Sequence, residues 1–297
     1  MCLSGLVRPV LLLLITKTQD AAYLSERSYM ELHELRKLPH LSSSSISDYV
    51  DCGMLYKFGR IDRVPREFSA DSLLYGTTAH KVLADIYQGK LLNSPLELKE
   101  ILGQFEQYWT EATDNNAEIK YAAGKSFETY LIEGRDLFTT YYNKIPADDF
   151  RVLAIEEAFS FKLEGLDINL IGAMDLIEED ESGTIIITDW KTAGKSYSND
   201  DVDKNFQLTL YQMAAQANGF ADREILLRFD CLIKTKTPKF EQYYTTRSDE
   251  DILRAKKKIM QVADGISKGV FVPNDGHWKC KGCSFAEHCR NWFKEVA

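Results

Sequence analysis

The sequence comprises 297 residues, of which 44% are hydrophobic and 27% are charged, and its formal net charge is −9. These values are ordinary for a globular protein, and the length allows one large domain or two modest ones. The acidic excess argues against a protein that binds nucleic acid through its overall charge, although it is compatible with a local basic groove.

Near the N-terminus, residues 10–15 form a short apolar run. A bilayer span requires about 20 such residues, and no clear small-residue cleavage site follows. We therefore expect no membrane association, no secretion signal and a cytoplasmic protein. Residues 1–42 are interpreted as an N-terminal extension, with a polar helical pattern over residues 21–38.

The next segment predicts a helix that carries Cys52. Ser45 and Asp48 have the spacing of a capping box ahead of apolar positions, and Cys52 falls inside the predicted helix. Positive charges follow at Lys57, Arg60, Arg63 and Arg66. They fit either phosphate contacts or a solvated face.

Three amphipathic patterns predict helices over residues 72–88, 96–113 and 126–145. The first contains His80, a residue that in a helix is more often structural than metal-binding. Aromatic residues recur at helical spacing in the third, which is typical of core packing. We interpret residues 90–145 as a helical insertion.

After Pro146 the hydrophobic period changes to two, which predicts strands over residues 151–163, 170–177 and 184–188. The polar cluster EEDESG separates the last two strands and supplies Gly183 for a positive φ angle. If Asp180 faces Thr184, counting outward places Asp175 opposite Asp189, about 5 Å apart at Cβ. Strand alternation returns Lys191 to the face of Asp189. Both carboxylates interrupt apolar runs, which favours a cation beside them.

The C-terminal part alternates helix and strand again. A helix over residues 200–218 places Gln207 and Tyr211 one turn apart, and strands are expected over residues 224–233 and 242–246. Ser248 then caps a long helix to residue 268, whose lysines line either a nucleic-acid path or an exposed face. The whole pattern predicts an α/β fold with a mixed sheet flanked by helices.

Cysteines cluster at the end of the chain, where Cys280, Cys283 and Cys289 follow a C-x2-C-x5-C spacing. Close thiols in a chain without secretion features favour a metal centre over disulfides. Cys52 is our choice for the fourth ligand; His277 and His288 are the alternatives and would give a zinc site. Spacing alone does not separate zinc from an iron-sulfur cluster. Such a clasp closes a very long loop, which restricts the unfolded chain.

Taken together, residues 43–289 resemble the RecB-like branch of the PD-(D/E)XK nuclease superfamily, especially AddB-type subunits and CRISPR-associated RecB-like exonucleases with iron-sulfur clusters. The matching motifs, in chain order, are G-T-T-A-H ending at His80, G-A-M-D ending at Asp175, D-W-K at residues 189–191 and Q-L-T-L-Y at residues 207–211. One departure is Gly53, where the family usually has proline after the first cysteine. The combination is specific, although each motif alone is weak.

The resemblance implies a restriction-endonuclease-like nuclease domain over residues 43–297, with a helical insertion and a C-terminal cysteine clasp. It implies that His80, Asp175, Asp189 and the carbonyl of Trp190 bind Mg²⁺ or Mn²⁺. Lys191 would activate water and stabilise the phosphate, and Gln207 and Tyr211 would position the strand. It also implies a [4Fe-4S] cluster on Cys52, Cys280, Cys283 and Cys289, with structural Zn²⁺ as the alternative.

The expected function is metal-dependent hydrolysis of DNA, as an exonuclease on single-stranded or frayed ends in DNA repair, recombination or CRISPR adaptation. A-G-K-S at residues 193–196 lacks the first glycine of a Walker motif, because Asp189 stands there. Any helicase or CRISPR-adaptation protein would thus be a separate partner. The competing hypothesis is a non-catalytic DNA-binding or scaffolding subunit of a helicase-nuclease complex.

Overall fold

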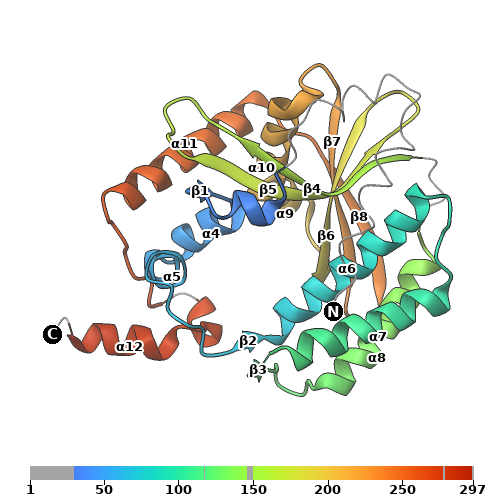
Figure 1. The fold of residues 1–297 in the computed structure, drawn as a ribbon, viewed down its shortest axis with the longest axis horizontal. Helices are drawn as coiled ribbons and strands as arrows, with labels where there is room; N and C mark the ends of the chain where they lie inside the picture. The colour runs from blue at the N-terminus through green and yellow to red at the C-terminus, as the bar shows by residue number, and fades with distance from the viewer. Residues whose placement is uncertain (1–29, 117, 146–149, 277, 296–297) are drawn as a thin grey trace.

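The computed structural model describes residues 30–116, 118–145, 150–276 and 278–295 (Figure 1). The predicted apolar run at residues 10–15 and the alternative ligand His277 lie outside these ranges. Among the described helices, none combines the length and apolar character that crossing a bilayer requires.

A mixed sheet flanked by helices forms the centre of the molecule, as the sequence predicts, but it has a sixth strand, β1 (His40–Leu41), that no sequence pattern indicated. The other strands are β4 (Arg151–Phe161), β5 (Asn169–Glu179), β6 (Ile185–Ala193), β7 (Ile225–Ile233) and β8 (Lys239–Thr245). The hydrogen-bonded order is β1-β5-β6-β7-β8. Strands β1 and β6 pair with different stretches of one edge of β5, and β4 pairs with the opposite edge. The pairs β1–β5 and β6–β7 are parallel, and the others are antiparallel.

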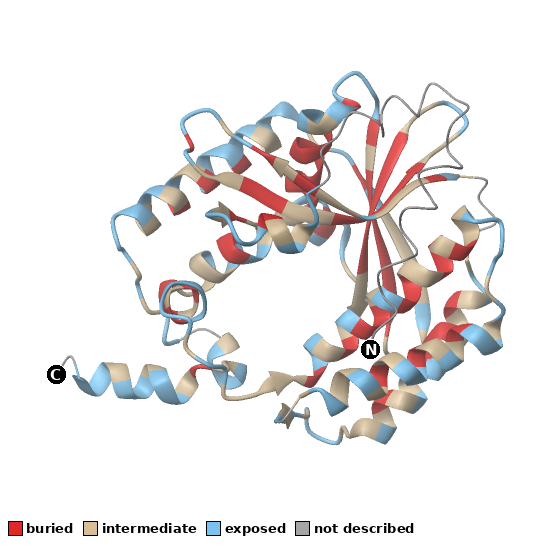
Figure 2. Cartoon of the chain, in the orientation of Figure 1, coloured by how far each residue is buried: buried red, intermediate tan, exposed pale blue. Residues whose placement is uncertain are grey.

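Helices cover both faces of the sheet (Figure 1). On one face lie α6 (Asp71–Leu91), α7 (Leu98–Asp114) and α8 (Phe127–Tyr142); on the other lie α4 (Ser43–Asp51), α10 (Phe206–Ala215) and α11 (Asp249–Ser267). The buried residues concentrate on the strands and on the helix faces that meet them (Figure 2). This arrangement positions the site, because each layer contributes residues to it.

Shorter elements complete the chain. They are α3 (Leu32–Leu35), α5 (Gly53–Tyr56), the π-helix η1 (Lys57–Ile61), β2 (Ser69–Ala70), β3 (Ile119–Lys120), α9 (Asn199–Asp203), the π-helix η2 (Gln216–Phe220), the 3₁₀ helix η3 (Trp278–Gly282) and α12 (Ala286–Glu295). The elements η3 and α12 lie next to α5, away from the sheet (Figure 1).

Three helix predictions need correction. The capping box before α4 is formed by Ser42 and Ser45 rather than by Ser45 and Asp48, because the first two exchange side-chain and backbone hydrogen bonds. Cys52 is not helical; its extended backbone, with φ of −165°, separates α4 from α5. The helix predicted over residues 200–218 is interrupted before α10, where Asn205 caps a new helix.

The hairpin has the predicted register. Asp180 donates its backbone N–H to the carbonyl of Thr184 at 3.1 Å, and Gly183 has a φ of +87°. The β5–β6 ladder runs outward to Leu176 opposite Thr188 and then ends. Asp175 and Asp189 are the next two residues, so they lie where the strands separate.

Strand β5 therefore changes its neighbour along one edge. That edge pairs β1 at Asn169 and Leu170 and β6 at Leu176 to Glu179; over the described residues, no strand pairs it between these two stretches. We call this opening the fork. On its other edge β5 pairs with β4 over most of its length.

A local distortion of the backbone of β4 lies opposite the fork. The pairs Ile155–Leu176 and Glu157–Met174 flank Glu156, which stands across from Asp175 and has a φ of +49°. This left-handed backbone is uncommon for glutamate. Apolar residues change faces at the same point, since Met174 contacts one core cluster and Leu176 the other.

The helices α7 and α8 pack closely at Gly134. A Cβ atom at this position would lie 1.9 Å from the ring of Phe105, which is fully buried. Replacing Gly134 with alanine should therefore destabilise the protein by about 1–3 kcal/mol, because the ring cannot move away without strain. The free energy of unfolding in urea checks this.

Gly103 is the matched control, because it lies in α7 and a Cβ atom added there would have no neighbouring atom within 4 Å. Gly103→Ala should stabilise the helix by about 0.4–1 kcal/mol through the unfolded chain. Equal effects of the two substitutions would contradict the packing described.

Candidate active site

Side chains from four elements converge where β5 and β6 separate. Asp175 comes from β5, Asp189 and Lys191 from β6, His80 from α6, and Gln207 and Tyr211 from α10. The sequence-predicted site residues are thus brought together by the fold. Their segments are up to 131 residues apart in the chain, from His80 to Tyr211.

Asp175 continues the sheet with its side chain. The backbone N–H of Trp190 donates to Oδ2 of Asp175 at 2.8 Å, just beyond the last ladder pair. Nε2–H of His80 donates to the carbonyl oxygen of Trp190 at 2.9 Å, and Nδ1 of His80 lies 3.6 Å from Oδ2 of Asp175. The predicted ligands His80, Asp175 and Trp190 are therefore mutual neighbours.

Asp189 is buried and forms an ion pair with Lys191. Burial and the negative charge of Asp175 raise the pKa of Asp189 above its usual range, against the opposing effect of Lys191. Burial alone would lower the pKa of Lys191, but the charge of Asp189 outweighs it and raises that pKa. The pair thus keeps an ammonium group next to the carboxylates.

His80 responds to the same charges. Burial alone would lower the pKa of its imidazole, but the hydrogen bond and negative charge of Asp175, with a further contribution from Asp189, raise that pKa above its usual value. A divalent cation bound among these groups would replace the imidazole proton as the positive charge next to the carboxylates.

Gln207 and Tyr211 close a ring of hydrogen bonds around the ion pair. Lys191 donates to Oε1 of Gln207 at 3.0 Å, and Nε2 of Gln207 donates to the hydroxyl of Tyr211 at 2.9 Å. That hydroxyl donates to Oδ1 of Asp189 at 3.2 Å. Burial holds the pKa of Tyr211 well above its usual value, so its hydroxyl stays a donor.

The donor set fits a hard divalent cation. Carboxylate and carbonyl oxygens with one imidazole are ligands that Mg²⁺ and Mn²⁺ accept. Within the described part of the chain, however, no three His, Cys, Asp or Glu side chains are already grouped closely enough to hold a metal ion. Side-chain adjustment would accompany binding, because Asp189 is turned to Lys191 and Asp175 to the backbone of Trp190.

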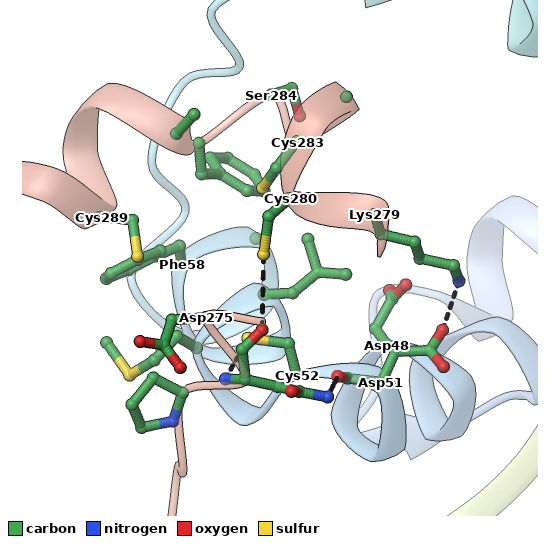
Figure 3. Close-up of a pocket in the computed structure, with 18 of the residues that line it drawn as sticks. Asp48, Asp51, Cys52, Phe58, Asp275, Lys279, Cys280, Cys283, Ser284 and Cys289 are labelled. Atoms are coloured by element: carbon green, nitrogen blue, oxygen red, sulfur yellow. Dashed lines mark hydrogen bonds and ion pairs between the residues drawn. The ribbon is translucent and has the colours of Figure 1, made fainter. Parts of the chain in front are cut away.

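The cysteines line a second region, a cavity of about 880 Å³ next to α5 and α12. Figure 3 shows Cys52 across this cavity from Cys280 and Cys283, with Cys289 at its side. Burial raises the pKa of Cys289, and the nearby thiols of Cys52, Cys283 and Cys280 raise it further. The four predicted thiols therefore line one cavity, but over the described residues no three of them are already grouped closely enough to hold a metal ion.

Of the two described candidates for the fourth ligand, Cys52 lines this cavity and His288 does not. The Cys52 thiol accepts a hydrogen bond from the backbone N–H of Asn274 at 3.4 Å, whereas the ring of His288 packs edge-on against Phe58 and does not line the cavity. Four thiols as a donor set fit either an iron-sulfur cluster or zinc.

Sequence reasoning missed a further cavity of about 660 Å³ in the fork. Its lining includes the site residues Asp175, Gln207 and Tyr211, together with residues that no motif indicated: Arg36, His40, Ser43 and Ser47. The run of serines before Cys52 was the available signal, but its position beside Asp175 depends on the long-range pairing of β1 with β5.

Comparison with known proteins identifies the superfamily of this chain. Residues 40–290 match the PD-(D/E)XK nuclease superfamily. The Gene 69 protein of Mycobacterium phage D29 is 27% identical over 278 residues, which cover 85% of this chain and 97% of the phage protein. A crystal structure of a Eubacterium rectale protein, provisionally named an exonuclease, superposes with a TM-score of 0.52 at 13% identity and 92% coverage of each chain. The chain belongs to the PD-(D/E)XK nuclease superfamily.

Proposed function

We propose that this nuclease hydrolyses DNA with Mg²⁺ or Mn²⁺ and acts as an exonuclease on single-stranded or frayed ends. The observation that carries the proposal is the convergence of His80, Asp175 and Asp189 beside the ammonium group of Lys191. Membership of a nuclease superfamily supports the chemistry. The provisional exonuclease name of the Eubacterium rectale protein supports the preference for ends.

Each site residue has a role in this proposal. His80, Asp175, Asp189 and the carbonyl of Trp190 would hold the cation, which when bound supplies charge neutralisation and an acidified water. Lys191 would orient the attacking water and stabilise charge on the scissile phosphate. Gln207 and Tyr211 fix Lys191 and Asp189 through the hydrogen-bond ring.

We further propose that residues 43–297 form the nuclease domain, with residues 90–145 as a helical insertion and the cysteines as a clasp. The gathering of Cys52, Cys280, Cys283 and Cys289 around one cavity supports a [4Fe-4S] cluster of the RecB-like type, with zinc as the alternative. A pathway in DNA repair, recombination or CRISPR adaptation, with a separate helicase, fits such an enzyme.

Removing the ammonium group or the buried carboxylate should abolish cleavage. We expect Lys191→Ala and Asp189→Ala to lower the rate of DNA hydrolysis by about 100–1,000-fold or more, because each removes a charge from the reacting centre. The rate is measured on labelled single- and double-stranded DNA with free and blocked ends. Lys99→Ala, at an exposed position of α7, is the control. Parent-like cleavage by both site variants would contradict the assigned site, and no cleavage by the parent protein would favour the non-catalytic subunit.

Metal binding should stabilise the parent protein. At a Mn²⁺ concentration of roughly one hundred times Kd, the free energy of unfolding should rise by about 2.7 kcal/mol, because the cation binds only the folded site. The shift in Tm with added Mn²⁺ measures this. Asp175→Ala should lose most of the shift, and an equal shift in parent and variant would place the metal elsewhere.

The cysteine cavity should hold iron and acid-labile sulfide in anaerobically purified protein, with broad visible absorption. Cys280→Ser should lower the iron content, because it removes one thiolate ligand. Cys231→Ala, a change at a buried thiol in β7, should leave the iron content intact. Zinc without iron would favour the zinc alternative. Protein that contains neither iron nor zinc would contradict the clasp.

A further inference from the structure

The cavity in the fork adjoins the site through shared walls. It has a volume of about 660 Å³, and Asp175, Gln207 and Tyr211 line it together with Ile171 and Gly172 of β5. Pockets of about 300–1,000 Å³ accommodate ligands of small-molecule size. One or two nucleotide units fit such a space, whereas a duplex does not.

The cavity lining also contains groups that can bind an anion. It contains Arg36 at the end of α3 and the hydroxyl groups of Ser43 and Ser47 on α4. The exposed guanidinium of Arg36 forms no ion pair or hydrogen bond with any described side chain. A guanidinium and hydroxyl groups are the donors with which proteins contact phosphate.

The floor of the cavity is formed by β5 and its neighbours. Here the edge of β5 between Leu170 and Leu176 meets neither β1 nor β6, so its backbone faces the cavity rather than another strand. Phe159, Ile171 and Leu210 add apolar surface. A ligand with one anionic group and one less polar part matches this combination of walls and floor.

We propose that the fork binds a nucleotide of a single DNA strand adjacent to the scissile phosphate, with its phosphate at Arg36, Ser43 and Ser47. This inference rests on the proposed nuclease function and names the substrate form of that site. The carboxylate of Asp175 repels a phosphate, so a cationic group such as Arg36 in the same lining is needed to hold the strand there. The fork thereby gives the site its preference for an unpaired strand.

Binding of a labelled single-stranded oligothymidylate, followed by fluorescence anisotropy with Ca²⁺ in place of Mg²⁺, tests the proposal. Arg36→Ala should weaken binding several-fold and make the slope of log K against log salt shallower by about 0.7, the contribution of one phosphate contact on a single strand. Ser47→Trp, on the exposed surface of α4, should block the cavity and weaken binding further. The Kd for Mn²⁺ should not change in either variant.

Arg135→Ala is the matched control, because it removes the same charge from an exposed position of α8 and breaks only an exposed pair with Glu106. Parent-like binding by Arg36→Ala overturns the proposal, as does an equal loss in Arg36→Ala and Arg135→Ala. The Arg36 result decides alone if Ser47→Trp does not fold. If the parent protein cleaves DNA and Arg36→Ala binds the strand normally, the subsite is rejected but the nuclease function is retained. If the parent binds the strand through Arg36 and does not cleave it, the subsite is retained and the nuclease function is rejected.

Discussion

The burial of Asp189 next to Asp175 is the electrostatic constraint on which the arrangement of this protein depends. Two carboxylates removed from water repel each other, and an unpaired buried charge is costly. Lys191, the hydroxyl of Tyr211 and the N–H of Trp190 each offset part of that cost. Because these partners come from β6 and α10, the packing of α10 against the sheet also determines the geometry of the site.

The fork meets this electrostatic constraint through the backbone. If β6 continued to pair with β5 beyond Leu176, ladder hydrogen bonds would occupy the position where Asp175 now meets Trp190. The separation of the strands leaves the carboxylate free to approach β6 from the side, and a cavity lies beside β1 and the unpaired stretch of β5. Catalytic geometry and substrate access therefore come from the same irregularity of the sheet.

Much of this could be predicted from sequence, because the signals are local. Strand alternation and the conformational freedom of Gly183 set the hairpin register, and helical spacing brings Gln207 to Tyr211. Long-range contacts could not be predicted this way. The two residues of β1 pair with the same edge of β5 that β6 uses further along. Arg228, Glu178 and Asp230 form a buried charge cluster between strands. No propensity indicates that Glu156 adopts a positive φ. The extended backbone of Cys52 precedes Gly53, whose N–H donates to the distant carbonyl of Val272.

The backbone distortion at Glu156 also affects the outer edge of the sheet. Strand β4 is an outer strand of the sheet, and over the described residues it pairs only with β5. A long, flat outer strand is a template on which another chain can add a strand, which leads to aggregation. The irregular register between Val152 and Ala154 and the left-handed residue that follows make β4 a poor template. The distortion that faces Asp175 thus also protects the protein from self-association at this edge.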